Sequence, residues 1–321
     1  MIITVLLLIA GFVALIFGAS KLVDAASSIA VGMGIPNIVI GLTIVAFGTS
    51  APELVVNLMA AVSENTEMVV GNVLGSNIFN ILGILGICAL ISPLTVKSST
   101  TWLEIPLSFL AAVCVLFIGA DQYLNGALDN VLTRSEGLTL LLFFLIFLVY
   151  NLTVAKSAGT DEKIETKKYG TWKAILFIVL GLAGLVLGGK LIVDSAVEIA
   201  QVFGMTERVI GLTIVSIGTS LPELATSIVA VRRKNVDIAI GNVVGSNIFN
   251  IFFILGLSTA ITPVPLSSGS FFDIIVCITA SLLLFMFVFT DKGNRIQRWE
   301  GGVFLLLYIL YVGELITGTA L

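Results

Sequence analysis

Long uncharged stretches alternate with short charged segments along the whole chain, and this pattern predicts membrane-spanning helices. A helix needs ~20 mainly apolar residues to cross ~30 Å of hydrocarbon. The uncharged stretches cover residues 2–20, 25–52, 68–96, 105–120, 137–155, 174–189, 238–272 and 274–290. Ten-residue segments of alternating polarity, which a membrane barrel would need, are not visible. The chain is therefore predicted to be an all-α polytopic membrane protein.

An internal duplication divides these helices into two halves. When the sequence is shifted by 170 positions, residues 11–96 align with residues 181–266 without a gap, and 28 of the 56 pairs from 41 to 96 are identical. The expected spans cover residues 2–22, 38–62, 68–91, 103–120, 136–155, 173–191, 209–231, 237–261, 271–289 and 300–318. Because each half has an odd number of spans, we expect ten transmembrane helices as two inverted five-helix repeats, over 1–155 and 173–321.

The composition narrows the chemistry. Only 11% of the residues are charged, against about 25% in soluble domains, so a soluble globular protein is excluded. The chain has no histidine and therefore lacks the commonest zinc ligand and general base. We interpret Cys88, Cys114 and Cys277 as packing residues, since they lie far apart in apolar runs. With no nucleophile and base pair and no cofactor motif, we expect neither an enzyme nor a cofactor.

The basic residues predict an orientation in a cell membrane. With the N-terminus on one side, the opposite side collects 13 Lys and Arg residues and the N-terminal side collects 3. The positive-inside rule makes the richer side cytoplasmic, so we expect both termini outside and the linker 156–172 in the cytoplasm. The lipid bilayer is then an expected partner, with no nucleic acid and no evident protein partner.

Two acidic residues in apolar surroundings occupy equivalent positions of the repeat. Glu53 lies in GLTIVAFGTSAPEL and Glu223 lies in GLTIVSIGTSLPEL. A carboxylate at the centre of a bilayer costs at least ~2.5 kcal/mol on insertion scales, so it suggests a functional site. The alternative is a salt bridge between helices, but neither repeated segment contains Lys or Arg. The missing countercharge is therefore expected to come from a cation in solution.

A proline precedes each glutamate and predicts a broken helix. Proline inside a helix lacks the N–H that would pair with a carbonyl one turn earlier. The breaks carry hydroxyl groups on Thr49 and Ser50 in one half and on Thr219 and Ser220 in the other. Irregular backbone at membrane depth is tolerated where it lines a wet cavity, as in transporters with inverted repeats. A simple proline kink is the alternative for either half alone.

The second repeated block adds further polar side chains. GNVLGSNIFNI returns as GNVVGSNIFNI, which places Ser76 four residues before Asn80 and Ser246 four residues before Asn250. Residues four apart share one face of a helix. We expect Asn77 and Asn247 to point elsewhere and to form hydrogen bonds between helices.

Together these side chains form an all-oxygen donor set. Calcium takes six to eight hard oxygen ligands, and such a set also accommodates sodium. Two carboxylates would neutralise one divalent ion. Ions that compete for the same oxygens provide a physical basis for exchange. The expected donors are the side chains of Glu53, Glu223, Thr49, Thr219, Ser50, Ser220, Ser76, Ser246, Asn80 and Asn250.

The paired GTSAPE and GTSLPE segments with their GSNIFN partners resemble the repeats of the calcium/cation antiporter superfamily, of the sodium/calcium exchanger type in a minimal, prokaryotic form. The resemblance implies that calcium binds Glu53 and Glu223 together with Thr49 and Thr219. It implies that sodium uses Ser50, Ser220, Ser76 and Ser246, with the backbone at Ala46 and Ser216 nearby. It also implies that the first and sixth spans slide across the binding core.

One departure from the family pattern concerns charge. Many such exchangers carry an aspartate at one of the positions matched by Asn80 and Asn250, and this chain carries asparagine at both. The expected function is a sodium/calcium antiporter with alternating access. The alternatives are a calcium/proton antiporter, an antiporter of another divalent cation and, in third place, a passive cation channel. A smaller expectation is that Asp24 and Asp194 form interfacial pairs near Lys21 and Lys190.

Overall fold

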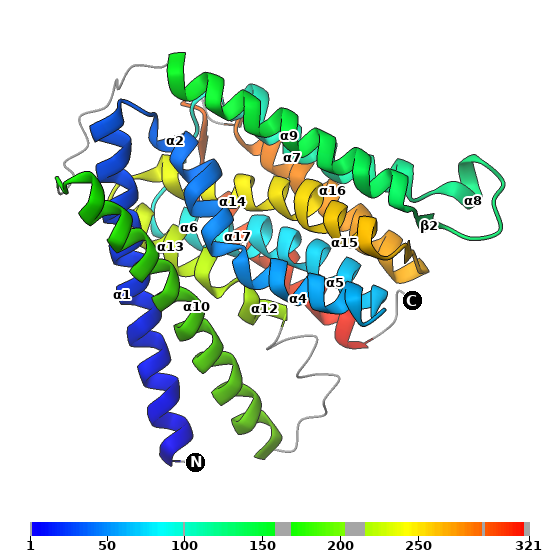
Figure 1. Ribbon diagram of the computed structural model, residues 1–321, viewed down its shortest axis with the longest axis horizontal. Coiled ribbons are helices and arrows are strands. Elements are labelled where there is room, and N and C mark those ends of the chain that lie inside the picture. The colour runs from blue at the N-terminus through cyan, green and yellow to red at the C-terminus, as the bar shows by residue number, and fades with distance from the viewer. Residues whose placement is uncertain (1, 99, 158–167, 203–215, 291–292, 318–321) are drawn as a thin grey trace. The chain divides into compact units, whose positions relative to one another are not determined.

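The computed structural model describes residues 2–98, 100–157, 168–202, 216–290 and 293–317 (Figure 1). Nearly all of the described chain is helical. The helices are α1 (Ile2–Met33), α2 (Asn37–Ile40), η1 (Gly41–Val45), α3 (Ala46–Thr49), α4 (Ala51–Val62), α5 (Thr66–Ile78), η2 (Phe79–Leu85), α6 (Gly86–Ile91), η3 (Thr100–Glu104), α7 (Ile105–Ile118), α8 (Asp121–Leu124), α9 (Arg134–Ser157), α10 (Thr171–Val202), α12 (Ser216–Thr219), α13 (Leu221–Arg232), α14 (Val236–Ile248), η5 (Phe249–Leu255), α15 (Gly256–Ile261), α16 (Ser268–Phe287) and α17 (Arg298–Thr317), where η marks a π-helical segment.

The predicted class, an all-helical polytopic membrane protein, is confirmed. Within the described residues, 8 helices are long and apolar enough to cross a bilayer, or up to 9 if the bent pair formed by residues 37–49 and 51–62 counts as one span. The predicted span 209–231 begins outside the described residues, as does most of the predicted linker 156–172. Ten spans therefore remain a prediction.

The first and sixth predicted spans are longer than their sequences suggested. Helices α1 and α10 have 32 residues each, whereas the charges at Lys21 and Lys190 marked their expected ends. At 1.5 Å per residue such a helix is ~48 Å long, well beyond the hydrocarbon core. Helix α1 continues because polar partners surround its charged turn, and it ends before Gly34, whose φ is +67°.

The described chain forms two compact units, and each contains segments of both repeat halves. The first unit comprises Met1–Ala51 and Asn151–Val243. Its largest contact is between α1 and α10, which run side by side in Figure 1. Small residues allow this approach, since a Cβ on Gly18 would lie 2.7 Å from the carbonyl oxygen of Gly181. Close packing through glycine is typical of membrane helices, where apolar side chains gain little by leaving lipid.

A polar face of α1 forms hydrogen bonds and an ion pair within the first unit. The predicted ion-pair partner of Asp24 was wrong. Asp24 forms an ion pair with Arg233 from the end of α13, rather than the local pair expected beside Lys21. Arg233 also donates to Ser20 Oγ (2.6 Å). The Lys21 ammonium instead lies over the Phe177 ring, 4.9 Å from its centroid. These contacts give the charged side chains Lys21 and Asp24 of α1 partners within the protein.

The second unit comprises Pro52–Tyr150 and Val244–Leu321. Its centre is formed by α5 with η2 and by η5, which contact each other. Helix α16 packs on α5 and α7, and α17 packs on η2 and α6. Ile84, Leu85, Ile254 and Leu255 are fully buried in the central segments. The two repeated GSNIFN blocks therefore lie in the best-packed part of this unit.

Two short strand pairs, which the sequence did not reveal, close the ends of helices in the second unit. β1 (Leu94–Thr95) pairs antiparallel with β4 (Arg295–Ile296), with Leu94 opposite Ile296. β2 (Val131–Leu132) pairs antiparallel with β3 (Val264–Pro265), with Leu132 opposite Val264. Each pair joins one strand from either half of the duplicated sequence.

Candidate ion-binding site

The predicted helix breaks before both glutamates are confirmed. Helix α3 ends at Thr49, and Ser50 has φ −83° and ψ 11° before α4 begins. In the other half α12 ends at Thr219, and Ser220 has φ −92° and ψ 9° before α13 begins. Proline occupies the first turn of each new helix, where its missing N–H breaks no intrahelical hydrogen bond.

Both glutamates lie in the first turn of the helix that follows the break. Glu53 belongs to the first turn of α4 and Glu223 to that of α13, and each side chain is 1% exposed. The N-terminus of a helix carries a partial positive charge that favours a nearby carboxylate by ~0.3–1 kcal/mol. This offsets part of the cost of burying the charge.

In the first unit, Glu223 is the centre of a polar cluster. Its Oε1 accepts a hydrogen bond from Ser50 Oγ at 2.7 Å. Thr49 Oγ1 lies 3.0 Å from Asn242 Oδ1 and donates to it. The Asn242 amide nitrogen donates to the Glu223 backbone oxygen (3.2 Å) and to Ser227 Oγ (3.0 Å). Three predicted donors, Thr49, Ser50 and Glu223, are thus brought together.

Asn242 is a residue of the site that the sequence interpretation missed. It lies in the identical GNV segment that opens the second repeated block, and its repeat counterpart is Asn72. Its side chain is fully buried and connects α14 to both α3 and α13 through the bonds above. The signal available was an amide at the same place in both halves of the duplication.

In the second unit, four asparagines of the central helices form one hydrogen-bonded group. Asn77 Nδ2 donates to the Asn247 backbone oxygen (3.2 Å), and Asn247 Nδ2 donates to that of Asn77 (3.3 Å). The predicted hydrogen bonds of these two amides between helices are therefore confirmed. Asn80 and Asn250 donate their own amide nitrogens into the group. Their Oδ1 atoms are buried and accept no hydrogen bond in the described structure.

Asn80 and Asn250, two of the predicted donors, lie in π-helical turns. Asn80 is the second residue of η2 and Asn250 the second residue of η5, two seven-residue segments at equivalent places in the repeat. π-helical turns inside α-helices occur frequently at functional sites. The shared wide turn indicates that the repeated sequence specifies it.

The other predicted donors are distributed over both units. Ser76 and Ser246 are buried on α5 and α14, and Ser220 is buried at the second break. Thr219 is partly exposed, and Ala46 is buried at the start of α3. Ser216 begins α12, and its side chain lies outside the described structure. Glu53 belongs to the second unit, where its backbone oxygen accepts from Asn57 Nδ2 at 2.8 Å.

Neutral oxygens dominate both clusters. Among the residues that the structure describes, no three Asp, Glu, Cys or His side chains gather in a metal-binding arrangement. The cluster around Glu223 has one carboxylate among hydroxyl and amide oxygens and the other has amide oxygens, and hard oxygen donors of these kinds suit cations such as sodium and calcium. Oxygen sets with few carboxylates bind such ions less firmly than a cage of several carboxylates.

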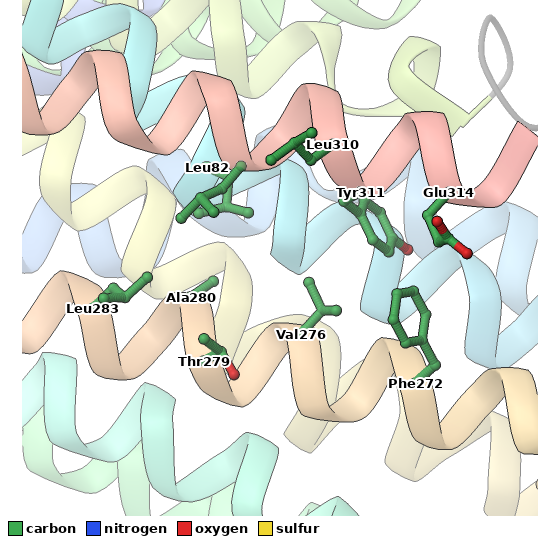
Figure 2. A pocket seen from close by; sticks show the side chains of 10 residues that line it. Leu82, Phe272, Val276, Thr279, Ala280, Leu283, Leu310, Tyr311 and Glu314 are labelled. Atoms are coloured by element: carbon green, nitrogen blue, oxygen red, sulfur yellow. The ribbon is translucent and has the colours of Figure 1, made fainter. Parts of the chain in front are cut away.

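A separate cavity of about 260 Å³ opens between η2, α16 and α17 (Figure 2). Its wall is mostly apolar; the polar side chains are Tyr311 and Glu314 at one end and Thr279, whose hydroxyl donates to the Ile275 backbone oxygen at 2.8 Å. Tyr311 donates through its hydroxyl to Asp273 Oδ1 at 2.8 Å. Figure 2 shows leucine, valine, alanine and phenylalanine side chains together with Thr279 along the rest of the wall. This cavity offers too few oxygens to bind a cation, and none of the predicted donors lines it.

Known proteins are similar to this chain in both sequence and fold. A family model described as sodium/calcium exchanger protein matches residues 3–153 and 173–316. The chain is 41% identical over 320 residues to a putative antiporter, CaxA, of Alkalimonas amylolytica, covering 97% of this chain and 98% of the relative. It is 34% identical over 351 residues to the sodium/calcium exchanger MaX1 of Methanosarcina acetivorans, with coverage of 96% and 97%.

Solved structures are similar to this chain in three dimensions as well. A structure of the sodium-calcium exchanger NCX_Mj soaked with 10 mM Na⁺ and zero Ca²⁺ matches with a TM-score of 0.82 and 31% identity, covering 97% of this chain and 98% of that one. A structure of the same exchanger soaked with zero Na⁺ and Ca²⁺ matches with a TM-score of 0.83 and 32% identity, covering 98% and 99%.

Proposed function

The chain belongs to the sodium/calcium exchanger family, and from that premise we propose that it exchanges calcium for sodium across a cell membrane by secondary antiport. The Oδ1 atoms of Asn80 and Asn250 carry this proposal, because both are buried acceptors to which no group of the described structure donates. A buried acceptor without a donor is costly, and a cation removes that cost.

The roles of the individual oxygens follow the resemblance. We assign calcium to Glu53 and Glu223 with Thr49 and Thr219, and sodium to Ser50, Ser220, Ser76 and Ser246 with the backbone at Ala46 and Ser216. The amide oxygens of Asn80 and Asn250 complete the set. The hydrogen bond from Ser50 to Glu223 supports this assignment, since it links a sodium ligand to a calcium ligand.

Shared ligands couple the two ion flows. Ser50 donates its hydroxyl proton to Glu223 and would offer its lone pairs to sodium, so a sodium ion at Ser50 would lie beside the carboxylate proposed to bind calcium and would compete with calcium for it. Ten helices in two inverted repeats, with both termini outside and the linker in the cytoplasm, would expose the oxygens to each side in turn. The family's three sodium ions for one calcium would move one net charge per cycle, worth ~2.3 kcal/mol per 100 mV. The chain would then be a transporter of ions that needs no cofactor.

Proteoliposomes test the function directly. Purified protein is reconstituted, the vesicles are loaded with sodium, and dilution into sodium-free buffer should drive uptake of radioactive calcium. Glu53→Gln and Glu223→Gln should each abolish uptake, because a neutral amide cannot balance the ion. Glu67→Gln is the matched control, since Glu67 is exposed. Uptake that survives both buried substitutions would refute the assignment.

Two further conditions separate the alternatives. A pH gradient without sodium would drive calcium uptake only in a proton-coupled antiporter. Calcium flux without any counter-ion gradient, at rates far above those of a rocking cycle, would indicate a channel.

A further inference from the structure

We propose that Asn77 and Asn247 are positioning residues, which hold the amides of Asn80 and Asn250 so that only their oxygen atoms are presented to transported ions. This inference rests on the proposed function, and it assigns to Asn77 and Asn247 a role beyond joining two helices. It follows from the hydrogen bonds among these four residues and from the two side-chain oxygens, those of Asn80 and Asn250, that accept none of these bonds.

The side-chain donors and acceptors of these four asparagines pair with one another. Asn80 Nδ2 donates to Asn247 Oδ1 at 2.9 Å, and Asn250 Nδ2 donates to Asn77 Oδ1 at 3.0 Å. Asn77 and Asn247 cannot turn to offer nitrogen instead, because their own Nδ2 atoms donate to each other's backbone oxygens. All four side chains are at most 2% exposed, so water does not compete readily for these bonds.

The pairing leaves the side-chain oxygens of Asn80 and Asn250 unused. An asparagine amide has donors on nitrogen and acceptors on oxygen, on opposite sides of one planar group. Once the nitrogens of Asn80 and Asn250 are engaged, their oxygens must point the other way. Both oxygens are buried and accept no hydrogen bond within the described structure. The pairing therefore leaves two buried acceptors to which no described group donates and which a cation or its water could satisfy.

The same pairing accounts for the amides at positions 80 and 250. Aspartate at position 250 would set a carboxylate oxygen against Asn77 Oδ1, two acceptors with no proton between them. If Asn77 turned its nitrogen toward that aspartate, its oxygen would face the backbone oxygen of Asn247. The same holds for position 80 and Asn247. This pairing thus fits a site with two amides and disfavours an ionised aspartate at either position, whereas a protonated aspartate could donate to the neighbouring asparagine oxygen.

A double-mutant cycle tests the proposal in proteoliposomes of the full chain. Asn77→Ala should raise the KM for calcium roughly tenfold, about 1.4 kcal/mol, with a much smaller effect on kcat. In an Asn250→Ala background the same change should alter KM less than twofold, because the amide it positions is gone. Asn247→Ala should behave in the same way with Asn80→Ala.

Crossed pairs provide the matched control. The side-chain oxygen of Asn77 does not bond to Asn80, so Asn77→Ala and Asn80→Ala should have additive effects on KM. A purely structural role for Asn77 would give equal losses in every background and would overturn the proposal. Should Asn77→Ala not fold, the Asn247 and Asn80 cycle decides alone, with the calcium-induced rise in thermal unfolding midpoint as the binding readout. Sodium-driven calcium uptake by the unmodified chain separates this outcome from failure of the proposed function itself.

Discussion

At the scale of single residues, the chemistry depends on how neutral groups orient a buried charge. Ser50 and Glu223 are 173 positions apart in sequence, yet their side chains form a 2.7 Å hydrogen bond. A hydrogen bond to a charged group contributes roughly 1.5–3 kcal/mol. Such a bond fixes the direction of the carboxylate, which would lower the ordering cost of the proposed ion binding.

Replacing Ser50 should therefore weaken ion binding more than folding. We expect Ser50→Ala to raise the half-saturating sodium concentration by roughly tenfold or more, since it removes both a proposed ligand and the bond that orients Glu223. The measurement is the sodium dependence of calcium exchange in proteoliposomes. Ser63→Ala is the control, because Ser63 is exposed and its hydroxyl bonds only to nearby backbone. An unchanged sodium dependence in Ser50→Ala would contradict this role.

At the scale of elements, α1 is fixed by two kinds of contact. One is the polar face that carries Ser20 and Asp24, which Arg233 holds. The other is a face of small residues against α10, where Gly18 and Gly181 approach closely. The resemblance to exchangers implies that the first and sixth spans slide, and glycine contacts suit sliding because they have no side chains that interlock.

The polar anchor of α1 should be measurable as stability. We expect Arg233→Ala to lower the free energy of unfolding by about 1.5–3 kcal/mol, because it leaves the buried Asp24 carboxylate without its ion pair. Thermal unfolding in detergent would report the change as a lower midpoint. Arg232→Ala serves as control, since the neighbouring Arg232 is exposed. Equal effects of the two substitutions would argue against the anchor.

The glycine contact makes a separate prediction. Gly18→Leu should disrupt packing and reduce both the yield of monodisperse protein and the unfolding midpoint, since a Cβ there meets the Gly181 oxygen at 2.7 Å and the Leu185 nitrogen at 2.8 Å. Backbone atoms cannot move aside as side chains do. Gly32→Leu on the same helix is the control, because a Cβ at Gly32 meets nothing within 4 Å. A well-folded Gly18→Leu protein would show that α1 and α10 have room to separate.

At the scale of the whole molecule, the distribution of basic residues predicts the orientation. Leu128 lies in the segment between α8 and β2, is 91% exposed and belongs to a loop predicted to be outside. Arg232 is exposed at the end of α13, on the side predicted to be cytoplasmic. In a background with the three native cysteines replaced, Leu128→Cys should react with an impermeant thiol reagent in intact cells. Arg232→Cys should react only after permeabilisation, and the reverse pattern would invert the topology.

The sequence by itself determined the helical membrane class, the duplication and the breaks beside Glu53 and Glu223. These features depend on interactions within a few residues, namely apolar runs, proline geometry and repeated motifs, and such interactions are visible in the chain. The prediction that Ser76 and Asn80 belong to an ion-binding site also rests on the sequence alone, because both repeated blocks carry the same polar residues.

Only the tertiary structure decided the partner of Asp24, the length of α1, the role of Asn242 and the direction of the Asn80 and Asn250 oxygens. Each depends on a group that lies far away in sequence, such as Arg233 for Asp24 and Asn247 for Asn80. A hydrogen bond has the same geometry whether its partner is 4 or 170 residues away. The sequence can therefore show that a buried polar group needs a partner, and the fold decides which group that partner is.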